Sequence, residues 1–266
     1  MIPDPKCIQA VLFDLDDTLI DWSGQTGHYL DFTRPHLDNI YDYLSEKDHT
    51  LPDRDVFYDS YLNVLINEWQ RAKTSWSGVN FGCALENFFN AIDLDCDQID
   101  VHKVMCIYDM EPIPGVALYA DTLSVLKSLR QRGYKIGLIT NSMMPMWMRD
   151  VELEAYGIIG YFDVRLTSGD VGYMKPHPFI YHQALDTLGI KPEQALFVGD
   201  RPANDIAGAN AAGLTSVLMS PSHIERELND VEPDHIITCL SELLPILEKL
   251  ELNITKTASL DQVHKP

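Results

Sequence analysis

The stretch VLFDLDDTL, at residues 11–19, joins a short apolar run to closely spaced carboxylates. Similar apolar runs recur at residues 135–140, 195–199, 216–219 and 235–238. Uninterrupted apolar runs of this length predict strands buried on both faces, as in a parallel sheet. Amphipathic segments beside the later runs predict helices at residues 118–132, where Leu123, Leu126 and Leu129 recur at helical spacing, and at 179–188 and 203–212. The alternation predicts an α/β fold with a doubly wound, Rossmann-like parallel-sheet core.

One segment interrupts this alternation. Between Leu19 and Pro114 strand signals are few, and apolar residues instead recur at helical spacing, at Leu37, Ile40, Tyr41 and Leu44 and again at Phe57, Tyr61, Val64 and Leu65. Pro112, Pro114 and Gly115 mark the end of the segment. We therefore predict a catalytic core at residues 1–21 and 113–251, an inserted α-helical cap domain at 22–112, and a loose C-terminal tail at 252–266.

The charge balance limits the partners of this chain. Forty acidic and twenty basic residues give a formal net charge of −20, and no run of lysine and arginine offsets it. Such a surface repels the phosphates of nucleic acids and the headgroups of anionic lipids. We expect neither nucleic acid nor membrane as a partner, and the oligomeric state stays open.

The cysteines and the N-terminal residues indicate the compartment. Five widely spaced cysteines show no zinc-ligand spacing, so we expect buried free thiols in a reducing cytosol. The first apolar run is too short for a signal peptide, Asp14 interrupts it, and no stretch reaches 18 apolar residues. We therefore expect a cytoplasmic protein.

Polar residues follow several of the predicted strands at the point where each strand ends. Asp14 and Asp16 lie two residues apart, so both carboxylates point the same way on an extended chain. The other members are Thr140 and Asn141 after GLIT, Asp200 after ALFVGD, Asp205 at the start of the next helix, and Lys175 in GYMKPHP. Open α/β sheets bind ligands at the carboxyl ends of their strands, so we expect these side chains at one edge of the sheet.

This group of side chains carries more negative than positive charge. Two carboxylates about 4 Å apart repel each other by roughly 4 kcal/mol at an effective dielectric constant of about 20. Several of them facing only Lys175 need a cation, and Mg²⁺ suits because it accepts carboxylates, waters and phosphate. The Thr140 hydroxyl, the Lys175 ammonium and the amides at helix starts suit a phosphate group. The residues therefore predict Mg²⁺-dependent phosphoryl transfer.

In their order and spacing, these residues resemble the haloacid dehalogenase superfamily of phosphohydrolases. The resemblance rests on DLDDTL at residues 14–19, Thr140-Asn141 at a strand end, Lys175 before Pro176, and GDRPAND at residues 199–205. It covers residues 9–20 and about 114–247. The predicted helical segment sits where the superfamily has its first-type (C1) cap domain.

The resemblance implies a role for each carboxylate. Asp14 would be the nucleophile that attacks phosphorus and forms an aspartyl-phosphate. Asp16 would be the general acid for the leaving alcohol and then the base for the water that hydrolyses the intermediate. Mg²⁺ would be held by Asp14, the main-chain carbonyl of Asp16, and Asp200, with Asp205 supporting the site.

The resemblance also implies how the phosphate is bound. Thr140 and Asn141 would contact the phosphoryl oxygens, and Lys175 would neutralise developing charge and hold Asp14. Taken singly, each residue has an ordinary structural interpretation: Thr140 as a strand residue, Lys175 as a surface lysine, and Asp205 as a helix-start residue.

Other functions stay open. Haloacid dehalogenases lack a carboxylate two residues after the nucleophile, so Asp16 favours phosphate esters instead. A phosphosugar mutase would use the same four motifs. From a different class, a receiver-type signalling module or another non-catalytic phosphate-binding protein could share the fold, although Asp14, Asp16, Lys175 and Asp200 are all present.

The substrate is the least determined feature. A helical cap over the strand ends excludes bulk water and macromolecules, so we expect a small phosphorylated metabolite such as a sugar phosphate, phosphoglycolate or a nucleotide. Most aromatic residues of the cap are expected in its core, with one or two lining the substrate pocket; the candidates are Trp22, Phe57, Tyr58, Tyr61, Trp69 and Trp76.

Overall fold

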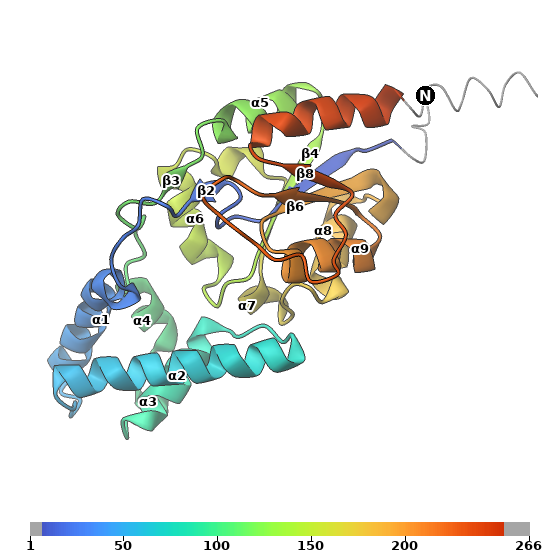
Figure 1. The fold of residues 1–266 in the computed structure, drawn as a ribbon. Coiled ribbons are helices and arrows are strands. Elements are labelled where there is room, and N and C mark those ends of the chain that lie inside the picture. The colour runs from blue at the N-terminus through green and yellow to red at the C-terminus, as the bar shows by residue number, and fades with distance from the viewer. Residues whose placement is uncertain (1–6, 253–266) are drawn as a thin grey trace, which may run out of the picture.

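The computed structural model describes residues 7–252, apart from the side chains of residues 29 and 30. At its centre lies a six-stranded parallel sheet with the spatial order β5-β4-β1-β6-β7-β8 (Figure 1). Its strands are β1 (Ala10–Phe13), β4 (Lys135–Thr140), β5 (Val164–Thr167), β6 (Ala195–Gly199), β7 (Thr215–Met219) and β8 (His235–Ile237). The arrangement confirms the predicted doubly wound α/β core.

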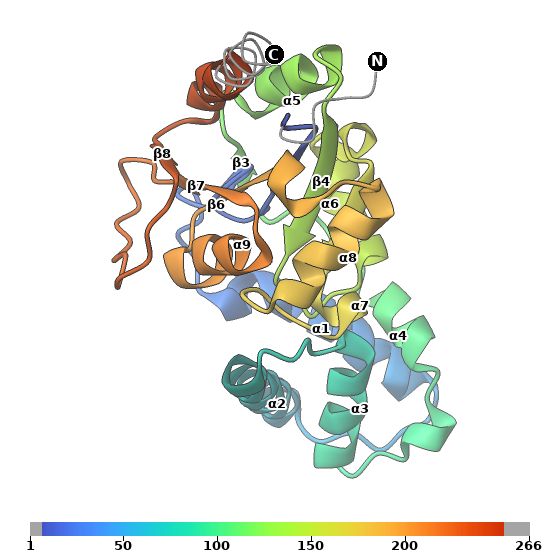
Figure 2. The same cartoon turned by 90° about the vertical axis from the view of Figure 1, so that its right-hand side faces the viewer.

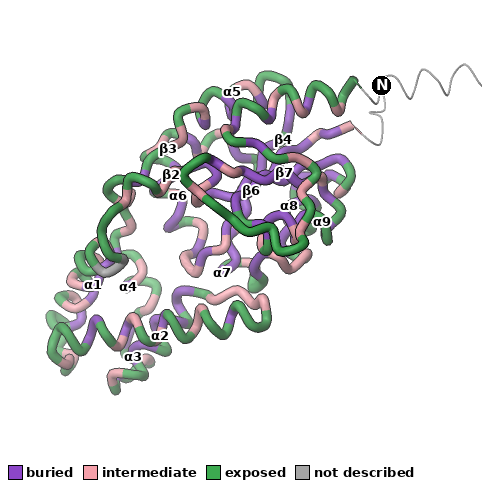
Figure 3. The backbone as a smooth tube through the Cα atoms, in the orientation of Figure 1, coloured by how far each residue is buried: buried purple, intermediate pink, exposed green. Residues whose placement is uncertain are grey.

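Helices cover both faces of the sheet, because successive residues of a strand point to opposite sides. Val11 and Phe13 of β1 share a hydrophobic cluster with α5 (Thr122–Gln131) and with the helical residues 243–252. Ala10 and Leu12 belong to a second cluster, formed with α8 (Pro178–Leu188) and α9 (Ala207–Ala212). The strands are accordingly among the most buried segments (Figure 3). The continuous apolar run at the start of the chain is thus explained by burial on both faces.

The core and its connections contain further elements. They are α6 (Met146–Ala155), α7 (Ser168–Val171), the 3₁₀ turns Cys96–Gln98, Ile159–Tyr161, Pro192–Gln194 and Leu240–Glu242, and the π-helical turn η4 (Pro202–Ile206), which leads directly into α9. The predicted helix at residues 203–212 is therefore a π turn followed by an α-helix.

One strand of the six-stranded sheet was missed by the sequence analysis. Strand β5 has the sequence VRLT, in which Arg165 interrupts the apolar run. Its guanidinium is satisfied by Asp150, because Arg165 Nε donates to Asp150 Oδ1 at 2.7 Å. A paired arginine at the edge of the sheet removes the continuous apolar signal that the inner strands give.

The predicted helix at residues 118–132 was too long at its start. Residues Ala117–Leu118 form β3 instead, which pairs antiparallel with β2 (Ile20–Asp21), and α5 begins only at Thr122. Leu123, expected on the buried face, is 45% exposed, and Val125 takes the inward position beside Leu126 and Leu129.

The cysteines also differ from expectation. All five are free thiols, as predicted, but none is buried: Cys83 and Cys106 are exposed and Cys7, Cys96 and Cys239 are intermediate. Two of them stand on outward faces of helices in residues 22–112, where no core packing covers them. Separately, within residues 7–252 no helix is long and apolar enough to span a membrane.

Between β2 and β3 the chain forms α1 (Tyr29–Glu46), α2 (Arg54–Ser75), α3 (Phe81–Ala91) and α4 (Val101–Ile107). We refer to residues 22–112 as the helical insert. Its helices share a separate hydrophobic cluster, which also includes Met148 of α6 and in which the rings of Phe57 and Phe88 meet edge to face with centroids 4.8 Å apart. Figure 2 shows these helices together at the end of the core toward which β4 points. The division into domains at residues 22 and 112, and the tail at 252–266, stay predictions; residues 253–266 lie outside the described part.

The helical insert also contacts the core through the loop between α2 and α3. Gly78 N donates to Gly172 O at 2.8 Å, and Met174 N donates to Trp76 O at 2.9 Å. The backbones approach so closely that a Cβ atom at Gly78 would lie 1.8 Å from the carbonyl oxygen of Ser168. Glycine at this position is therefore needed for the contact between insert and core.

Replacing Gly78 by alanine should loosen this contact. The added methyl group meets backbone rather than a movable side chain, so we expect a loss of roughly 1–3 kcal/mol and a fall in Tm of several degrees. The matched control is Gly160→Ala, because a Cβ there meets no described atom within 4 Å. Differential scanning calorimetry should show a lower Tm for Gly78→Ala alone, and equal Tm values for both variants would contradict the tight contact.

Candidate active site

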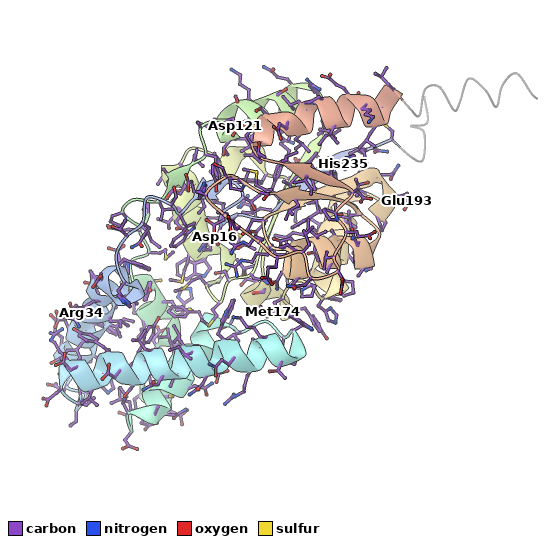
Figure 4. All side chains as sticks on the ribbon, in the orientation of Figure 1. Asp16, Arg34, Asp121, Met174, Glu193 and His235 are labelled. Carbon is purple, nitrogen blue, oxygen red and sulfur yellow. The ribbon has the colours of Figure 1, made fainter. Side chains whose placement is uncertain are left out.

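Three adjacent strands bring the predicted site residues to one edge of the sheet. Strand β1 lies between β4 and β6, and Asp14, Thr140 and Asp200 stand at or directly after the ends of these strands. Figure 4 shows Asp16 at the end of the core that faces the helical insert. The expected convergence at the carboxyl edge follows from the parallel register of the strands.

The centre of the site is a buried ion-pair cluster. Lys175 Nζ lies 2.6 Å from Asp14 Oδ1 and 2.7 Å from Asp205 Oδ1. The exposed fractions are 6% for Asp14, 2% for Lys175, 1% for Asp205 and 0% for Asp200. Ammonium and carboxylate groups at this depth are stable only when they are paired. The sequence-predicted contact between Lys175 and Asp14 is therefore present.

Asp205 is held in place by the turn that follows β6. Its Oδ2 accepts a hydrogen bond from Arg201 N at 2.9 Å, and its own N–H donates to Arg201 O at 2.7 Å. A Cβ atom at Gly199 would lie 2.4 Å from Asp205 Cγ, so the glycine leaves the space that the carboxylate fills. The GDRPAND motif thus supplies the turn after β6, the space beside Gly199 and the carboxylate of Asp205 in one short segment.

Burial has the largest effect on the pKa values of the carboxylates in the cluster. It raises the pKa of Asp14 to about 8; the Lys175 ammonium lowers this pKa, while Asp205 and Asp200 raise it further. Burial and the neighbouring Asp205 raise the pKa of Asp200 to about 6. For Lys175, burial alone would lower the pKa, but Asp14 and Asp205 raise it above its ordinary value, so the ammonium stays charged.

The carboxylates fit a divalent cation. Asp14, Asp200 and Asp205 each offer one oxygen, and these oxygens lie within 4.8 Å of one another. Asp200 Oδ2 accepts from Arg226 Nε at 3.1 Å, whereas the buried Asp200 Oδ1 has no hydrogen-bond partner among the described residues. A buried carboxylate oxygen without a donor is costly, and a hard cation such as Mg²⁺ would satisfy it.

Asp16 lies beside this cluster and has different partners. Trp22 Nε1 donates to Asp16 Oδ1 at 3.0 Å, and Arg149 Nη2 donates to the same atom at 3.1 Å. Arg149 is buried, and its Nε lies 2.9 Å from Glu152 Oε2 in the next turn of α6. The side chain of Asp16 is thereby held by one donor from the start of the helical insert and one from α6.

Asn141 holds the main chain of Lys175. Its Nδ2 donates to Lys175 O at 2.9 Å, and its Oδ1 accepts from Lys175 N at 2.8 Å. Asn204 Nδ2 donates to the same carbonyl at 2.8 Å. Both asparagines position the lysine. The predicted contact of Asn141 with a phosphate group stays a prediction. Thr140 ends β4 and is buried at the edge of the sheet.

The sequence analysis missed three partners of the site. Arg149 and Glu152 are charged residues on the inward face of an amphipathic helix after β4, a signal that could have been noticed. Arg226 follows β7 in a loop and reaches Asp200 and Asp17, which are 26 and 209 residues away in the sequence. No local pattern marks it.

A model of the haloacid dehalogenase-like hydrolase family matches residues 8–213, a span that contains Asp14, Lys175 and both later aspartates. The chain belongs to the haloacid dehalogenase-like hydrolases. It is therefore an enzyme, and the resemblance noted from the four motifs is confirmed.

Two proteins similar to this hydrolase are phosphatases by name. A glyceraldehyde 3-phosphate phosphatase from Methanothermobacter thermautotrophicus is 30% identical over 233 residues, which cover 86% of this chain and 91% of that protein. The crystal structure of a HAD phosphatase from Thermococcus onnurineus is 29% identical, covers 90% of this chain and 98% of that one, and has a TM-score of 0.59.

A dehalogenase shares the fold of this hydrolase. The structure of a 2-haloacid dehalogenase from Pseudomonas syringae gives a TM-score of 0.61 at 24% identity and covers 91% of this chain and 99% of that one. At this identity the likeness extends to the fold alone, so the chemistry has to be argued from the site.

Adding Mg²⁺ should stabilise the folded protein. At a hundred times Kd, binding to the native state contributes about 2.7 kcal/mol, so Tm should rise by several degrees in a thermal-shift assay without substrate. The Mg²⁺-dependent rise in Tm should be smaller at pH 6 than at pH 8. Protons compete with Mg²⁺ for Asp14 and Asp200, whose pKa values are about 8 and about 6.

Two variants test the ligand assignment. Asp200→Asn should lose most of the rise in Tm on adding Mg²⁺, because it replaces a carboxylate of the cluster. The rise is measured for each variant relative to its own Tm without metal. The control Asp59→Asn alters an exposed carboxylate on α2 and should keep the full rise. An unchanged response in Asp200→Asn would exclude that carboxylate as a ligand.

Proposed function

We propose that this hydrolase is a Mg²⁺-dependent phosphatase that hydrolyses a small phosphomonoester through an aspartyl-phosphate on Asp14. The observation that carries the proposal is the buried contact between Asp14 and Lys175, 2.6 Å long, beside the carboxylates of Asp200 and Asp205. A buried nucleophilic carboxylate with an ammonium partner and a cation-binding arrangement suits transfer of a phosphoryl group.

In the proposed reaction Asp14 attacks phosphorus, the bond from phosphorus to the leaving oxygen breaks, and an acyl phosphate forms. Lys175 favours the ionised carboxylate that this attack needs, against the effect of burial. It also offers positive charge where the phosphoryl oxygens collect negative charge. Asn141 and Asn204 hold its main chain, and Asp14 and Asp205 hold its ammonium, so the charge is in place before substrate binds.

Asp16 is proposed to donate a proton to the leaving alkoxide and then to take one from the water that hydrolyses the acyl phosphate. Trp22 and Arg149 both donate to this carboxylate, which leaves its orientation little freedom. A general acid held in one orientation lowers the entropy cost of the transfer step.

The metal proposal rests on the same residues. Asp14, Asp200 and the main-chain carbonyl of Asp16 would hold Mg²⁺, with Asp205 in support, and the ion would supply positive charge to the carboxylates and the phosphate. Thr140 is proposed to donate to a phosphoryl oxygen from the end of β4. We further propose that the helical insert acts as the cap of this site.

Phosphate esters suit this site better than haloacids. A dehalogenase needs no acid for a halide leaving group, whereas an alkoxide must be protonated as it leaves, and Asp16 stands beside the nucleophile in an anchored position. The three buried carboxylates likewise favour a metal-assisted reaction. A phosphosugar mutase would use the same groups and is distinguished by its product.

Replacing the two aspartates separately tests their roles. Asp14→Asn should abolish turnover and the phosphoenzyme, because an amide does not attack phosphorus. Asp16→Asn should slow release of inorganic phosphate from an alkyl phosphate about 10²–10⁴-fold, with a smaller loss for p-nitrophenyl phosphate, whose leaving group needs no proton. Chelation by EDTA should remove activity, and Mg²⁺ should restore it.

The control is Asp21→Asn, which alters a nearby carboxylate in β2 and keeps the oxygen that accepts from Ser23 N. It should retain near-parent rates. Substantial turnover by Asp14→Asn would overturn the nucleophile, full activity in chelated buffer would overturn the metal, and isomerisation of hexose phosphates without phosphate release would indicate a mutase.

A further inference from the structure

A cavity of about 620 Å³ lies between the helical insert and the core. Its wall includes Trp22 and Arg149, the two residues that donate to Asp16 Oδ1. Asn141 and Ser142, which directly follow Thr140, also belong to the wall. The cavity therefore adjoins Asp16, the proposed general acid. It is placed to hold the alcohol that leaves once Asp16 has protonated it.

The remainder of the described wall is largely apolar. Its members include Phe32, Leu62, Ile66, Trp69, Met143 and Met144. None of these six is fully buried, and Ile66 is 52% exposed. Apolar surface concentrated in one concavity is typical of a ligand-binding site.

Helix α2 shows that this surface is not simply part of the insert's core. One stripe of the helix, with Tyr58, Tyr61 and Leu65, packs into the hydrophobic cluster of the insert. A neighbouring stripe at i, i+4 and i+7, formed by Leu62, Ile66 and Trp69, lines the cavity together with Leu65. Leu62 also packs partly against the cluster, whereas Ile66 and Trp69 do not belong to it. A helix that only covered a core would need the first stripe and would carry polar residues on the second.

The polar groups nearest Asp16 are already engaged. The amide of Asn141 is bound to the main chain of Lys175, and Arg149 contacts Asp16 and Glu152. Ser142 Oγ accepts from Met144 N at 3.1 Å. The other polar members of the wall include Gln70, Lys73 and Glu111, all of which are exposed. The hydroxyl groups of a sugar placed beside Asp16 would therefore meet few available partners and would lose hydrogen bonds to water.

We infer that the preferred substrate is a phosphomonoester whose leaving alcohol carries an apolar, aromatic group, which packs against α2 and the two methionines that follow β4. This inference rests on the proposed phosphatase function and narrows its substrate class. Tryptophan and phenylalanine faces pack well against rings, and methionine adapts to their edges. A dry cavity of about 150 Å³ accepts benzene, so 620 Å³ leaves room for a fused ring system.

Three primary alkyl phosphates with similar leaving-group chemistry test the preference. They are 2-(2-naphthyl)ethyl phosphate, ethyl phosphate and glyceraldehyde 3-phosphate, the last being the compound that names a 30% identical relative. With Mg²⁺ present, kcat/KM for the naphthyl ester should exceed both others by at least about tenfold, since buried apolar groups discriminate by roughly 10–200-fold.

A matched pair of variants on α2 locates the preference. Ile66 and Val56 are each 52% exposed, but only Ile66 lines the cavity. Ile66→Gln should lower kcat/KM for the naphthyl ester about 3–10-fold and leave ethyl phosphate unchanged, whereas Val56→Gln should change neither. Calorimetric binding of 2-(2-naphthyl)ethylphosphonate should weaken by the same factor in Ile66→Gln alone.

The outcomes separate this inference from the function on which it rests. Equal kcat/KM for the naphthyl and ethyl esters, or a higher value for glyceraldehyde 3-phosphate, would overturn the apolar substrate class and leave the phosphatase intact. If no ester, p-nitrophenyl phosphate included, releases phosphate, the proposed function fails. The phosphonate calorimetry then still decides whether the cavity binds an apolar group, and absence of binding would overturn the inference.

Discussion

The buried ammonium of Lys175 between Asp14 and Asp205 is the interaction on which the site depends. Charges at this depth cost several kcal/mol each unless they are paired at short distance. The pairing requires the ends of β1 and β6 and the loop before α8 to lie close together. The parallel sheet places β1 beside β6, so that their carboxyl ends lie at the same edge. Neighbouring residues stabilise the same contact: the amides of two asparagines hold the main chain of Lys175, and Gly199 leaves space for Asp205.

One ammonium does not neutralise the whole cluster. Asp200 adds a third buried carboxylate, and Arg226 occupies only one of its oxygens. The raised pKa values of Asp14 and Asp200 express this excess of negative charge in a poorly solvated place. The same low solvation that makes the cluster costly would also strengthen every electrostatic contact of the proposed phosphate substrate there.

The core and the helical insert contribute different chemistry. The core supplies the charged groups at the sheet edge, while the insert and the segment after β4 supply an apolar wall. Trp22 and Arg149 join the two, since both contact Asp16 and both line the cavity. The backbone contact at Gly78 joins the insert to the core, so in the proposed function substrate selection would depend on how the insert sits on the core.

The sequence by itself determined the sheet, the helical insert and the charged cluster at the strand ends. Those features follow from local signals, namely apolar runs, helical spacing, and polar residues placed directly after strands. It missed β5, whose arginine breaks the apolar run, and misjudged Leu123, because the orientation of a side chain depends on its neighbours. Only the tertiary structure identified Arg149 as a partner of Asp16, 133 residues away, and Arg226 as a partner of Asp200. The cavity likewise needs residues from both the insert and the core, because an enclosed surface exists only after separate segments have packed together.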